Sequence, residues 1–549
     1  MSAPPAPVAT PMKNGNNTQS EVRDTESDSG PDTELQRQPS GPPYTVFTRR
    51  EKSWITFLVS VSALISPFGA TTFYPAMNQL SQVLGVNATE TNISITTYMV
   101  AQAIAPAIIG GMSDNSGRRL SFITCFVIYI VAAIGLALQT DYYALLFLRV
   151  LQACGGSAAI SLTMAVVSDI ATSAERGKYM GYATCGILFG PAFGPTIGGL
   201  LAQYLGWRSI FWFLAIFAGV LLILFVFLFP ETCRAVVGNG SIPARGLNRS
   251  VISYLQERKQ RKADSSSTQN DIDATAPSAA KRPFRLPNPL TTLRILGEKE
   301  SCIILLYNGF FFTGMMIVSS AIPYLFKAAY DLNEIKLGLC YIALGTGSLT
   351  SSLSTGRIVD WNFRRHAKLN NLPITRGKQQ DLRDFPIEKV RLQVVVPGHV
   401  VGTIGLVFFG WSVRYKVHLA ATEVSLFLIG LGVSTAFNNS NTLLLDLHRH
   451  QPATATAAVN FVRCLLSAVG SAAIIPMCRA MNAGWAFTLI ALIYVVLIGV
   501  VFWLMKSGMR WRQELERRKS EKESTERATA ATDNSGGSTT EKRRLGMAP

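Results

Sequence analysis

The sequence is poor in charge. Only 15% of its 549 residues are charged, whereas 48% are hydrophobic. Soluble proteins usually have roughly 25% charged residues. The charges are also concentrated in residues 1–50, 231–300, 358–392 and 506–549, so that the long stretches between these segments carry almost none. This shortage excludes an ordinary soluble domain and indicates a protein of the lipid bilayer.

Several chemistries lack the residues that they would need. The eight cysteines lie mostly in apolar stretches without paired spacing, which indicates neither a disulfide framework nor a zinc site. There is no nucleotide-binding loop, no catalytic carboxylate pair in an exposed domain and no His-rich cluster, so we expect no enzyme, metal or cofactor. The net charge of +17 comes from Lys and Arg in short loops and tails, as in membrane proteins, and we expect no nucleic-acid partner.

The sequence does contain apolar stretches that are long enough to cross a membrane. About 20 mainly apolar residues cross the hydrocarbon core, and twelve stretches meet this length. They are 54–78, 92–112, 120–138, 142–168, 179–202 and 208–229, and then 301–325, 335–357, 393–413, 421–445, 454–478 and 484–505. The predicted fold class is an all-α polytopic membrane protein.

The distribution of charge divides the chain into five parts. Residues 1–50 lack the apolar core of a signal peptide and predict a disordered cytoplasmic tail. A six-helix bundle over 51–230, a cytoplasmic loop over 231–299, a second bundle over 300–505 and a basic cytoplasmic tail over 506–549 follow. Lys and Arg gather in the loops after the even-numbered spans, which predicts that both termini are cytoplasmic.

The loop between the first two spans, on the predicted outer side, contains two N-glycosylation patterns. One begins at Asn87 and reads NAT, and the other begins at Asn92 and reads NIS. Such short patterns also arise by chance, and Asn92 lies close to the membrane. Glycosylation and an unmodified loop therefore both stay open.

The two halves share a motif at the same place. After the second span the chain reads GGMSDNSGRR, and after the eighth it reads GRIVDWNFRR. The residues at equal spacing are Gly110, Asp114, Arg118 and Arg119 in the first half and Gly356, Asp360, Arg364 and Arg365 in the second. Two similar halves are typical of transporters that rock open to either side of the membrane.

Three motifs resemble those of the major facilitator superfamily, and within it the fungal twelve-span drug:proton antiporters. They are the GGMSDNSGRR loop, the run GYATCGILFGPAFGPTIGG in the fifth span, and LLFLRVLQACGG in the fourth, which is built around an embedded arginine. In the eleventh span, ATATAAVNFVRCLL resembles the subgroup that contains quinidine-resistance, weak-acid-resistance and citrate exporters.

This resemblance implies a major facilitator fold of twelve helices in two pseudo-symmetric six-helix bundles. It also implies gate and motif residues, in which charged side chains latch helix ends, glycines allow close helix approach and a proline bends the fifth span. These residues are Gly110, Asp114, Gly117, Arg118, Arg119, Asp169, Arg176, Gly181, Gly190, Gly194, Pro195, Gly198, Gly199, Asp360, Arg364 and Asp446. A Gly-rich fifth span that merely packs well is the alternative.

The charged residues inside the spans indicate which kind of solute the protein carries. An ionised side chain there costs at least ~2.5 kcal/mol, so Arg149 and Arg463 are expected to face a wet cavity. Six spans, the first, second, fifth, seventh, eighth and eleventh, hold no Asp or Glu at central depth, which predicts a positive cavity that favours organic anions or polar solutes. For Arg149, nearer a span end, snorkelling to the surface is the alternative.

Neutral polar residues add to the expected pathway, although some of their amides could instead bond between helices. The expected substrate-binding residues are Arg149, Gln152, Arg463, Asn460, Tyr74, Asn308, Asn438 and Asn439, with Gln102 also on the pathway. Proton coupling lacks an obvious carrier, because arginine releases no proton at working pH. Asp169, Asp446 and His399 are the candidates, but both aspartates could be gate partners of arginines, and a lone His is often structural.

The expected function is a secondary active transporter that works as a monomer by alternating access. It exports an organic acid, secondary metabolite or drug, in exchange for protons or driven by the solute gradient and membrane potential alone. Its location is the plasma membrane of a fungus, with a vacuolar or other internal membrane as the alternative. The direction follows from the resemblance, and a nutrient importer and a receptor that binds solute without moving it stay open.

Overall fold

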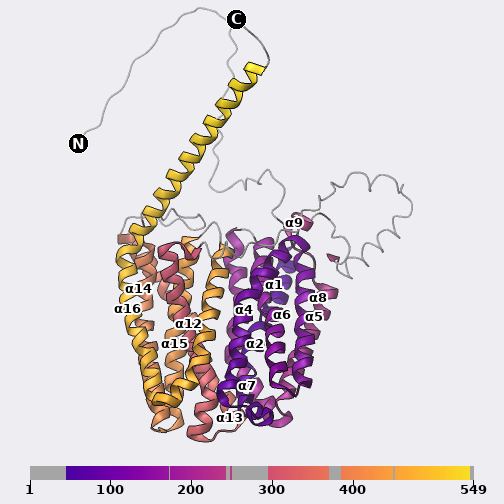
Figure 1. Cartoon of the computed structure of the whole chain (residues 1–549), viewed down its shortest axis with the longest axis vertical. Coiled ribbons are helices and arrows are strands. Elements are labelled where there is room, and N and C mark those ends of the chain that lie inside the picture. The colour runs from indigo at the N-terminus through magenta and orange to yellow at the C-terminus, as the bar shows by residue number, and fades with distance from the viewer. Residues whose placement is uncertain are drawn as a thin grey trace, which may run out of the picture. The chain divides into compact units, whose positions relative to one another are not determined.

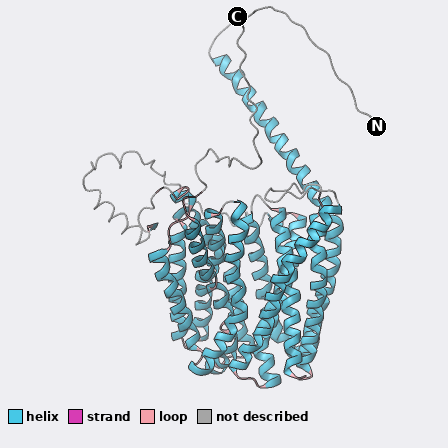
Figure 2. Ribbon diagram, turned by 180° about the vertical axis from the view of Figure 1, so that it is seen from behind, coloured by secondary structure: helices cyan, strands magenta, loops and turns pink. Residues whose placement is uncertain are grey.

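The computed structural model describes residues 45–171, 173–240, 242, 248–249, 295–369, 385–448 and 452–544. In these residues the regular structure is entirely helical, and Figures 1 and 2 show the helices of the two halves packed side by side. Most of the predicted N-terminal tail and of the loop between the halves lies outside the described residues.

The first half contains the first six predicted spans. The first span is interrupted at Leu64 and again at 72–73. Each interruption comes just before a proline, Pro67 or Pro75, which has no N–H group to continue the helical hydrogen bonds. The helices are α1 (Arg49–Ala63), α2 (Ile65–Thr71), the 3-10 turn η1 (Tyr74–Ala76), α3 (Met77–Leu84), α4 (Ala88–Ser116), α5 (Arg118–Leu138), α6 (Tyr142–Ile170), α7 (Ser173–Leu205), α8 (Arg208–Leu228) and the short α9 (Arg234–Val237).

The second half contains the remaining six spans. Its helices are α12 (Lys299–Tyr330), α13 (Glu334–Leu369), α14 (Ile387–Arg414), α15 (Leu419–Leu447) and α16 (Pro452–Arg544). The last of these holds two predicted spans, since Asn482, with a φ of 68°, interrupts the helix between them. The predicted basic tail from residue 506 continues α16 as a helix to Arg544, with ion pairs one turn apart such as Arg517 with Glu521.

Length and apolarity support the predicted spans. Nine helical segments among the described residues are long and apolar enough to cross a membrane, and the last, Ala455–Glu514, covers the eleventh and twelfth spans. The helices α7 and α13, outside those nine, have 33 and 36 residues. At 1.5 Å per residue both are long enough to cross as well. Each of the twelve predicted spans therefore corresponds to a helix or a helical segment.

The contacts between the halves are made mainly by α4 with α16 and by α7 with α13. We call the end of the bundle where α1, α5 and α14 begin the basic end, since Arg118, Arg119 and Arg391 lie there. The end where α7 ends and α13 begins is called the opposite end. Every membrane-spanning helix runs between these two ends.

Candidate substrate cavity

A cavity of about 130 Å³ lies between the two halves. Its walls come from α2, α4, α6 and α7 of the first half and from α12, α13, α15 and α16 of the second. At about 30 Å³ for each water in the liquid, this volume holds roughly four water molecules. The polar side chains of its lining are Ser66, Thr71, Gln102, Ser348, Ser434, Asn438, Arg463 and Ser467.

Arg463 is the charged residue of this cavity. Among the described residues that line it, no other carries a charge. Its Nη2 donates to Asn460 Oδ1 over 2.7 Å, and its guanidinium lies 4.5 Å from the centre of the Phe312 ring. Its Nε is buried without a hydrogen-bond partner in the described part of the chain. The structure places the Arg463 side chain on the wall of this cavity.

Asn460 connects Arg463 to the other half. Its Nδ2 donates to the carbonyl oxygen of Gln102 over 3.0 Å, which links α16 to α4. The side chain of Gln102, in turn, donates to Ser66 Oγ over 3.3 Å. The guanidinium is thus oriented by an amide that also joins the two halves.

Arg149 lies behind the wall of the cavity. Its side chain is fully buried, and its guanidinium lies 4.7 Å from the centre of the Phe73 ring and 4.5 Å from that of Tyr98. Its Nη1 donates to the Gly69 carbonyl over 2.7 Å and to Gln152 Oε1 over 2.8 Å. Neither expectation for Arg149 describes this position, because it neither lines the cavity nor reaches the surface.

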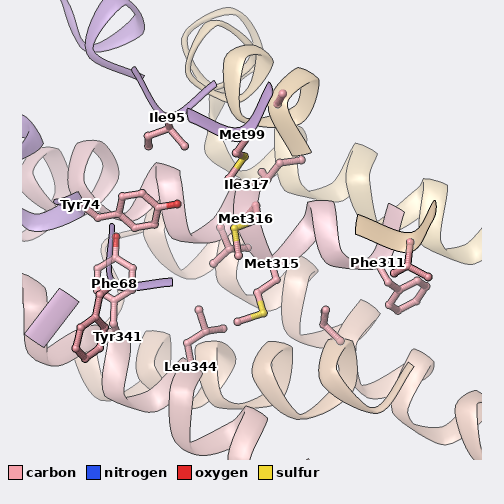
Figure 3. Close-up of a cluster of buried hydrophobic side chains, with 14 of the residues drawn as sticks. Phe68, Tyr74, Ile95, Met99, Phe311, Met315, Met316, Ile317, Tyr341 and Leu344 are labelled. Atoms are coloured by element: carbon pink, nitrogen blue, oxygen red, sulfur yellow. The ribbon is translucent and has the colours of Figure 1, made fainter. Parts of the chain in front are cut away.

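The other expected substrate-binding residues also include one that lines the cavity and several that do not. Asn438 lines the cavity, whereas Asn308 bridges α12 to α15 through Phe437 O at 3.1 Å and Ser440 Oγ at 2.8 Å. Figure 3 shows Tyr74 beside Tyr341, and their ring centres are 6.1 Å apart. The residues that do not line the cavity are Arg149, Gln152, Asn460, Tyr74, Asn308 and Asn439.

The charged gate of the first half is formed at the basic end. Arg118 Nε lies 2.9 Å from Asp169 Oδ2, which joins the start of α5 to the end of α6. The Glu231 carboxylate accepts hydrogen bonds from the backbone N–H groups of Arg118, Arg119, Thr232 and Cys233. Burial raises the pKa of the Glu231 carboxyl, and these four N–H groups act in the opposite direction. Glu231, which closely follows the sixth span, was not among the expected gate residues.

The corresponding gate of the second half uses Arg391, which was not among the expected gate residues. Arg391 donates to Asp446 Oδ2 from Nε at 3.1 Å and from Nη2 at 3.0 Å, which joins the start of α14 to the end of α15. Arg364 is exposed near the end of α13. The pairing of helix ends is therefore repeated in both halves. Among the described residues, an arginine of the shared motif takes part in this pairing only in the first half. The side chains of Asp114, Arg176 and Asp360 lie outside the described part.

The glycines of the fifth-span motif place α7 between two neighbours. A Cβ at Gly190 would lie 2.5 Å from Pro67 Cγ, and one at Gly194 would lie 2.5 Å from Thr71 Oγ1, both in α2. Gly198 likewise abuts Thr72, and a Cβ at Gly199 would lie 3.2 Å from the Cα of Gly338 in α13. By contrast, a Cβ at Gly110 would meet no atom of the described residues within 4 Å, so none of them makes the close approach expected there. The side-chain surroundings of Gly181 are outside the described part.

The halves are joined by hydrogen bonds at the opposite end. Asn78 Nδ2 donates to the Pro323 carbonyl over 2.9 Å, Thr196 Oγ1 donates to the Gly338 carbonyl over 3.1 Å, and Thr96 Oγ1 lies 3.2 Å from Ser471 Oγ. At the basic end, the ion pairs between described residues each join two residues of the same half: Arg118–Asp169, Arg391–Asp446 and Arg512–Glu388. The hydrogen bond between His448 and Glu298 also stays within one half. The cavity is therefore closed toward the opposite end.

Most of the chain, residues 59–471, matches the family model described as Major Facilitator Superfamily. The chain belongs to the major facilitator superfamily. The predicted resemblance to this superfamily is thereby confirmed. The prediction that the chain is a polytopic membrane protein is confirmed with it. The closed opposite end and the cavity between the halves follow from contacts within this chain and not from the family match.

Curated fungal relatives in the superfamily are similar over nearly the whole chain. MFS-type transporter phiD of a fungal species is 40% identical over 472 residues, which cover 86% of this chain and 71% of the relative. MFS-type transporter tstD of Talaromyces stipitatus is 35% identical over 514 residues, covering 94% and 90%. Citrate exporter 1 of Aspergillus niger is 32% identical over 506 residues, covering 90% and 94%. This superfamily member is accordingly a transporter and not an enzyme.

Solved structures of the superfamily share the fold. The xylose transporter XylE from E. coli, in a partially occluded inward-open conformation, gives a TM-score of 0.58 at 15% identity and covers 83% of this chain and 97% of its own. The human organic anion transporter MFSD10 gives a TM-score of 0.54 at 16% identity, with 85% and 100% covered. The predicted major facilitator fold is thus confirmed.

Two further expectations concern residues away from the cavity of this superfamily member. His399 is buried, with Nδ1 3.0 Å from Tyr307 Oη and Nε2 2.7 Å from the Tyr494 carbonyl. Since a carbonyl only accepts, Nε2 carries the proton and Nδ1 accepts from the tyrosine, which makes His399 a link between α12, α14 and α16. Asn92 is buried and donates to the Ser471 carbonyl, whereas Asn87 is exposed as the N-cap of α4.

Sequence reasoning also missed several residues, and only one of them carried a signal that could have been read. The serines of the cavity and its three methionines, Met99, Met315 and Met316, carry no distinctive spacing. Glu423, a carboxylate within α15, was a readable signal, because an acidic residue inside a span is rare. Its Oε1 is buried without a hydrogen-bond partner among the described residues, and it does not line the cavity.

Proposed function

We propose that this transporter carries a small organic anion out of the cytoplasm across the plasma membrane by alternating access. The observation that carries the proposal is Arg463, which alone is charged among the described residues lining the cavity. A guanidinium can bind a carboxylate through two parallel hydrogen bonds, and it repels a cation. A cavity between two halves is where a rocking motion would expose the solute to each side in turn.

The orientation is supported by the distribution of basic residues. Arg118, Arg119 and Arg391 lie at the basic end, and Lys and Arg are enriched on the cytoplasmic side of membrane proteins. The joined opposite end then faces outward, so that the solute enters from the cytoplasm. Export is further supported by the name of the relative Citrate exporter 1. On this orientation Asn87 is an exposed outer residue and the proposed site of glycosylation.

We propose the membrane potential, rather than proton exchange, as the driving force. Asp169 and Asp446 are engaged with arginines, and His399 is bonded at both ring nitrogens. None of these three expected proton carriers lines the cavity. An anion leaving a cell whose interior is negative gains about 2.3 kcal/mol per elementary charge for each 100 mV. Antiport with protons is the second candidate, and Glu423 would then be the first carboxyl to test.

The proposal is tested first in cells. The gene is overexpressed and deleted in a fungal host, and organic acids in the medium are profiled by mass spectrometry. We expect at least one acid to rise on overexpression and to fall on deletion. An importer would produce the reverse change, and a receptor that moves no solute would alter no acid in proportion to its abundance.

The driving force is then tested with purified protein in proteoliposomes. The acid identified in the medium is loaded inside, and its efflux is followed under a potassium diffusion potential or under a pH gradient. We expect the potential to accelerate efflux and the pH gradient to have no effect at constant potential. Acceleration by the pH gradient alone would contradict the proposed driving force and favour proton antiport.

A further inference from the structure

We infer that the solute is an amphiphilic organic anion, with a carboxylate bound at Arg463 and an apolar body packed against methionine and phenylalanine side chains. This inference rests on the proposed function, since it assumes that an anion passes through the cavity described above. It distinguishes such a solute from a compact polycarboxylate such as citrate. Two features of the cavity carry it: the number of cations in the wall and the nature of the remaining surface.

The first feature is the single positive charge. Citrate carries three carboxylates, and each buried carboxylate needs a cation or several hydrogen-bond donors. The cavity offers one guanidinium, and Arg149 lies behind the wall with its charge enclosed by Phe73 and Tyr98. The other polar groups of the lining are hydroxyls and the amides of Gln102 and Asn438. One carboxylate can pair with a cation here. The amide donors are already engaged, Gln102 with Ser66 and Asn438 with Ser352, so two more carboxylates would find no second cation and few donors in the described lining.

The second feature is the apolar surface beside the charge. Met99 of α4 and Met315 and Met316 of α12 line the cavity, and Figure 3 shows these three side chains close together. They come from both halves of the molecule. Methionine is flexible and polarizable, and it adapts to apolar ligands of varied shape. A citrate molecule has almost no apolar surface to place against them, whereas an alkyl or aromatic body has.

The aromatic residues fix the relation between charge and apolar surface. The Arg463 guanidinium lies 4.5 Å from the centre of the Phe312 ring and 5.9 Å from that of Phe437, and the two ring centres are 5.4 Å apart. Both phenylalanines line the cavity. Because the rings cover the face of the guanidinium, its edge is the part that can donate to a carboxylate. The apolar body then continues directly along the rings toward the methionines.

The inference is tested by binding to the full chain in lipid nanodiscs. Isothermal titration calorimetry at pH 7 compares 1-naphthaleneacetate, its neutral amide 1-naphthaleneacetamide, and citrate, with empty nanodiscs to correct for partition into lipid. We expect the naphthaleneacetate to bind at least tenfold more tightly than either of the others. Equal or tighter binding of citrate would overturn the inference.

Two variants separate the charge from the apolar surface. Arg463→Gln should abolish the preference for the acid over its amide, whereas the exposed Arg479 on the same helix gives the matched control Arg479→Gln, which should retain it. Met316→Gln keeps a similar side-chain length but adds a polar amide, and it should weaken the acid at least tenfold without weakening citrate. Unchanged binding of the acid to Met316→Gln would contradict the apolar contact.

The outcomes also distinguish this inference from the proposed function. Tight binding of citrate that is lost in Arg463→Gln would leave anion transport standing and refute the amphiphilic solute. If Arg463→Gln changes the binding of neither acid, the role of Arg463 fails, and the proposed function loses its supporting observation as well.

Discussion

Arg149 and Arg463 are both arginines within apolar helices, and they differ in what their donors contact. Arg149 donates to a backbone carbonyl and to Gln152 between two aromatic rings, inside the first half. Arg463 is held by one amide and lines the cavity. Arg149 also has nitrogens without a hydrogen-bond partner among the described residues, Nε and Nη2, but its side chain is fully buried behind the cavity wall. The first therefore holds helices together in this conformation, and the second is the one that can bind a solute.

Replacement of Arg463 should separate transport from folding. We expect Arg463→Ala to lower anion transport at least a hundredfold with surface expression unchanged, because the cavity loses its charge. Arg463→Lys should restore transport only in part, since an ammonium lacks the planar fork that binds both carboxylate oxygens. Transport of the radiolabelled acid and surface biotinylation measure the two properties. Equal transport by Arg463→Ala would refute the proposed role.

A second prediction at the scale of single residues concerns a buried cluster at the basic end of the second half. Arg512 Nη1 lies 3.1 Å from Glu388 Oε1, and the Glu388 side chain is 1% exposed. Arg512→Ala would leave that carboxylate buried without its cation, which costs about 3–5 kcal/mol. We expect a clearly lower melting temperature for the detergent-solubilised protein.

The double variant provides the control for this pair. Arg512→Ala combined with Glu388→Gln should recover much of the lost melting temperature, because the buried charge is then removed with its partner. If the double variant melts no higher than Arg512→Ala, the loss comes from the packing of the arginine stem and not from the ion pair.

At the scale of helices, α7 and α13 bring their backbones close together across the two halves. A Cβ at Gly338 would lie 2.6 Å from the carbonyl oxygen of Pro195, and a backbone atom cannot move aside as a flexible side chain can. We expect Gly338→Val to push the two helices apart and to open the opposite end. The accessibility of a cysteine introduced at Thr196 to a water-soluble maleimide should rise at least fivefold.

Gly356 lies on the same helix and provides the matched control. A Cβ there would meet no atom within 4 Å, so Gly356→Val should leave the accessibility at position 196 unchanged. An equal rise in both variants would mean that valine in α13 loosens the protein generally, and the closing role of Gly338 would be refuted.

Much of the helical framework could be predicted from the sequence, because crossing a bilayer demands a long apolar stretch and little else. The glycine spacing in α7 was also readable, since it reflects approach to α2 and α13. The contacts of individual side chains were less predictable. The depth of Arg149 follows from the sequence, but the face that α6 turns to the cavity depends on its neighbours. Similarly, Arg391 lies 27 residues after Arg364 in the chain, and only the packing of α14 on α15 makes it the partner of Asp446.

At the scale of the whole molecule, the contacts at the opposite end define one state of the transport cycle. Thr96 Oγ1 and Ser471 Oγ lie 3.2 Å apart on α4 and α16. Cysteines at both positions should form a disulfide on oxidation and hold this end closed. We expect transport by Thr96→Cys/Ser471→Cys to fall at least tenfold on oxidation and to recover on reduction.

Each single variant under the same oxidation is the control for this cross-link, because the chain contains other cysteines. Mass spectrometry of the digested protein identifies the bond itself. Full transport by a protein in which the bond has formed would show that the opposite end does not need to open.

The closure at the opposite end and the lining of the cavity use different residues. Pro195, Gly199 and Gly338 make contacts through backbone atoms, and none of them lines the cavity. Mutations that alter the solute, at Met316 or Phe437 for example, therefore leave the closing contacts unchanged. In evolutionary terms, duplicated copies of such a gene can diverge in the metabolite that they carry while they inherit the same closing machinery.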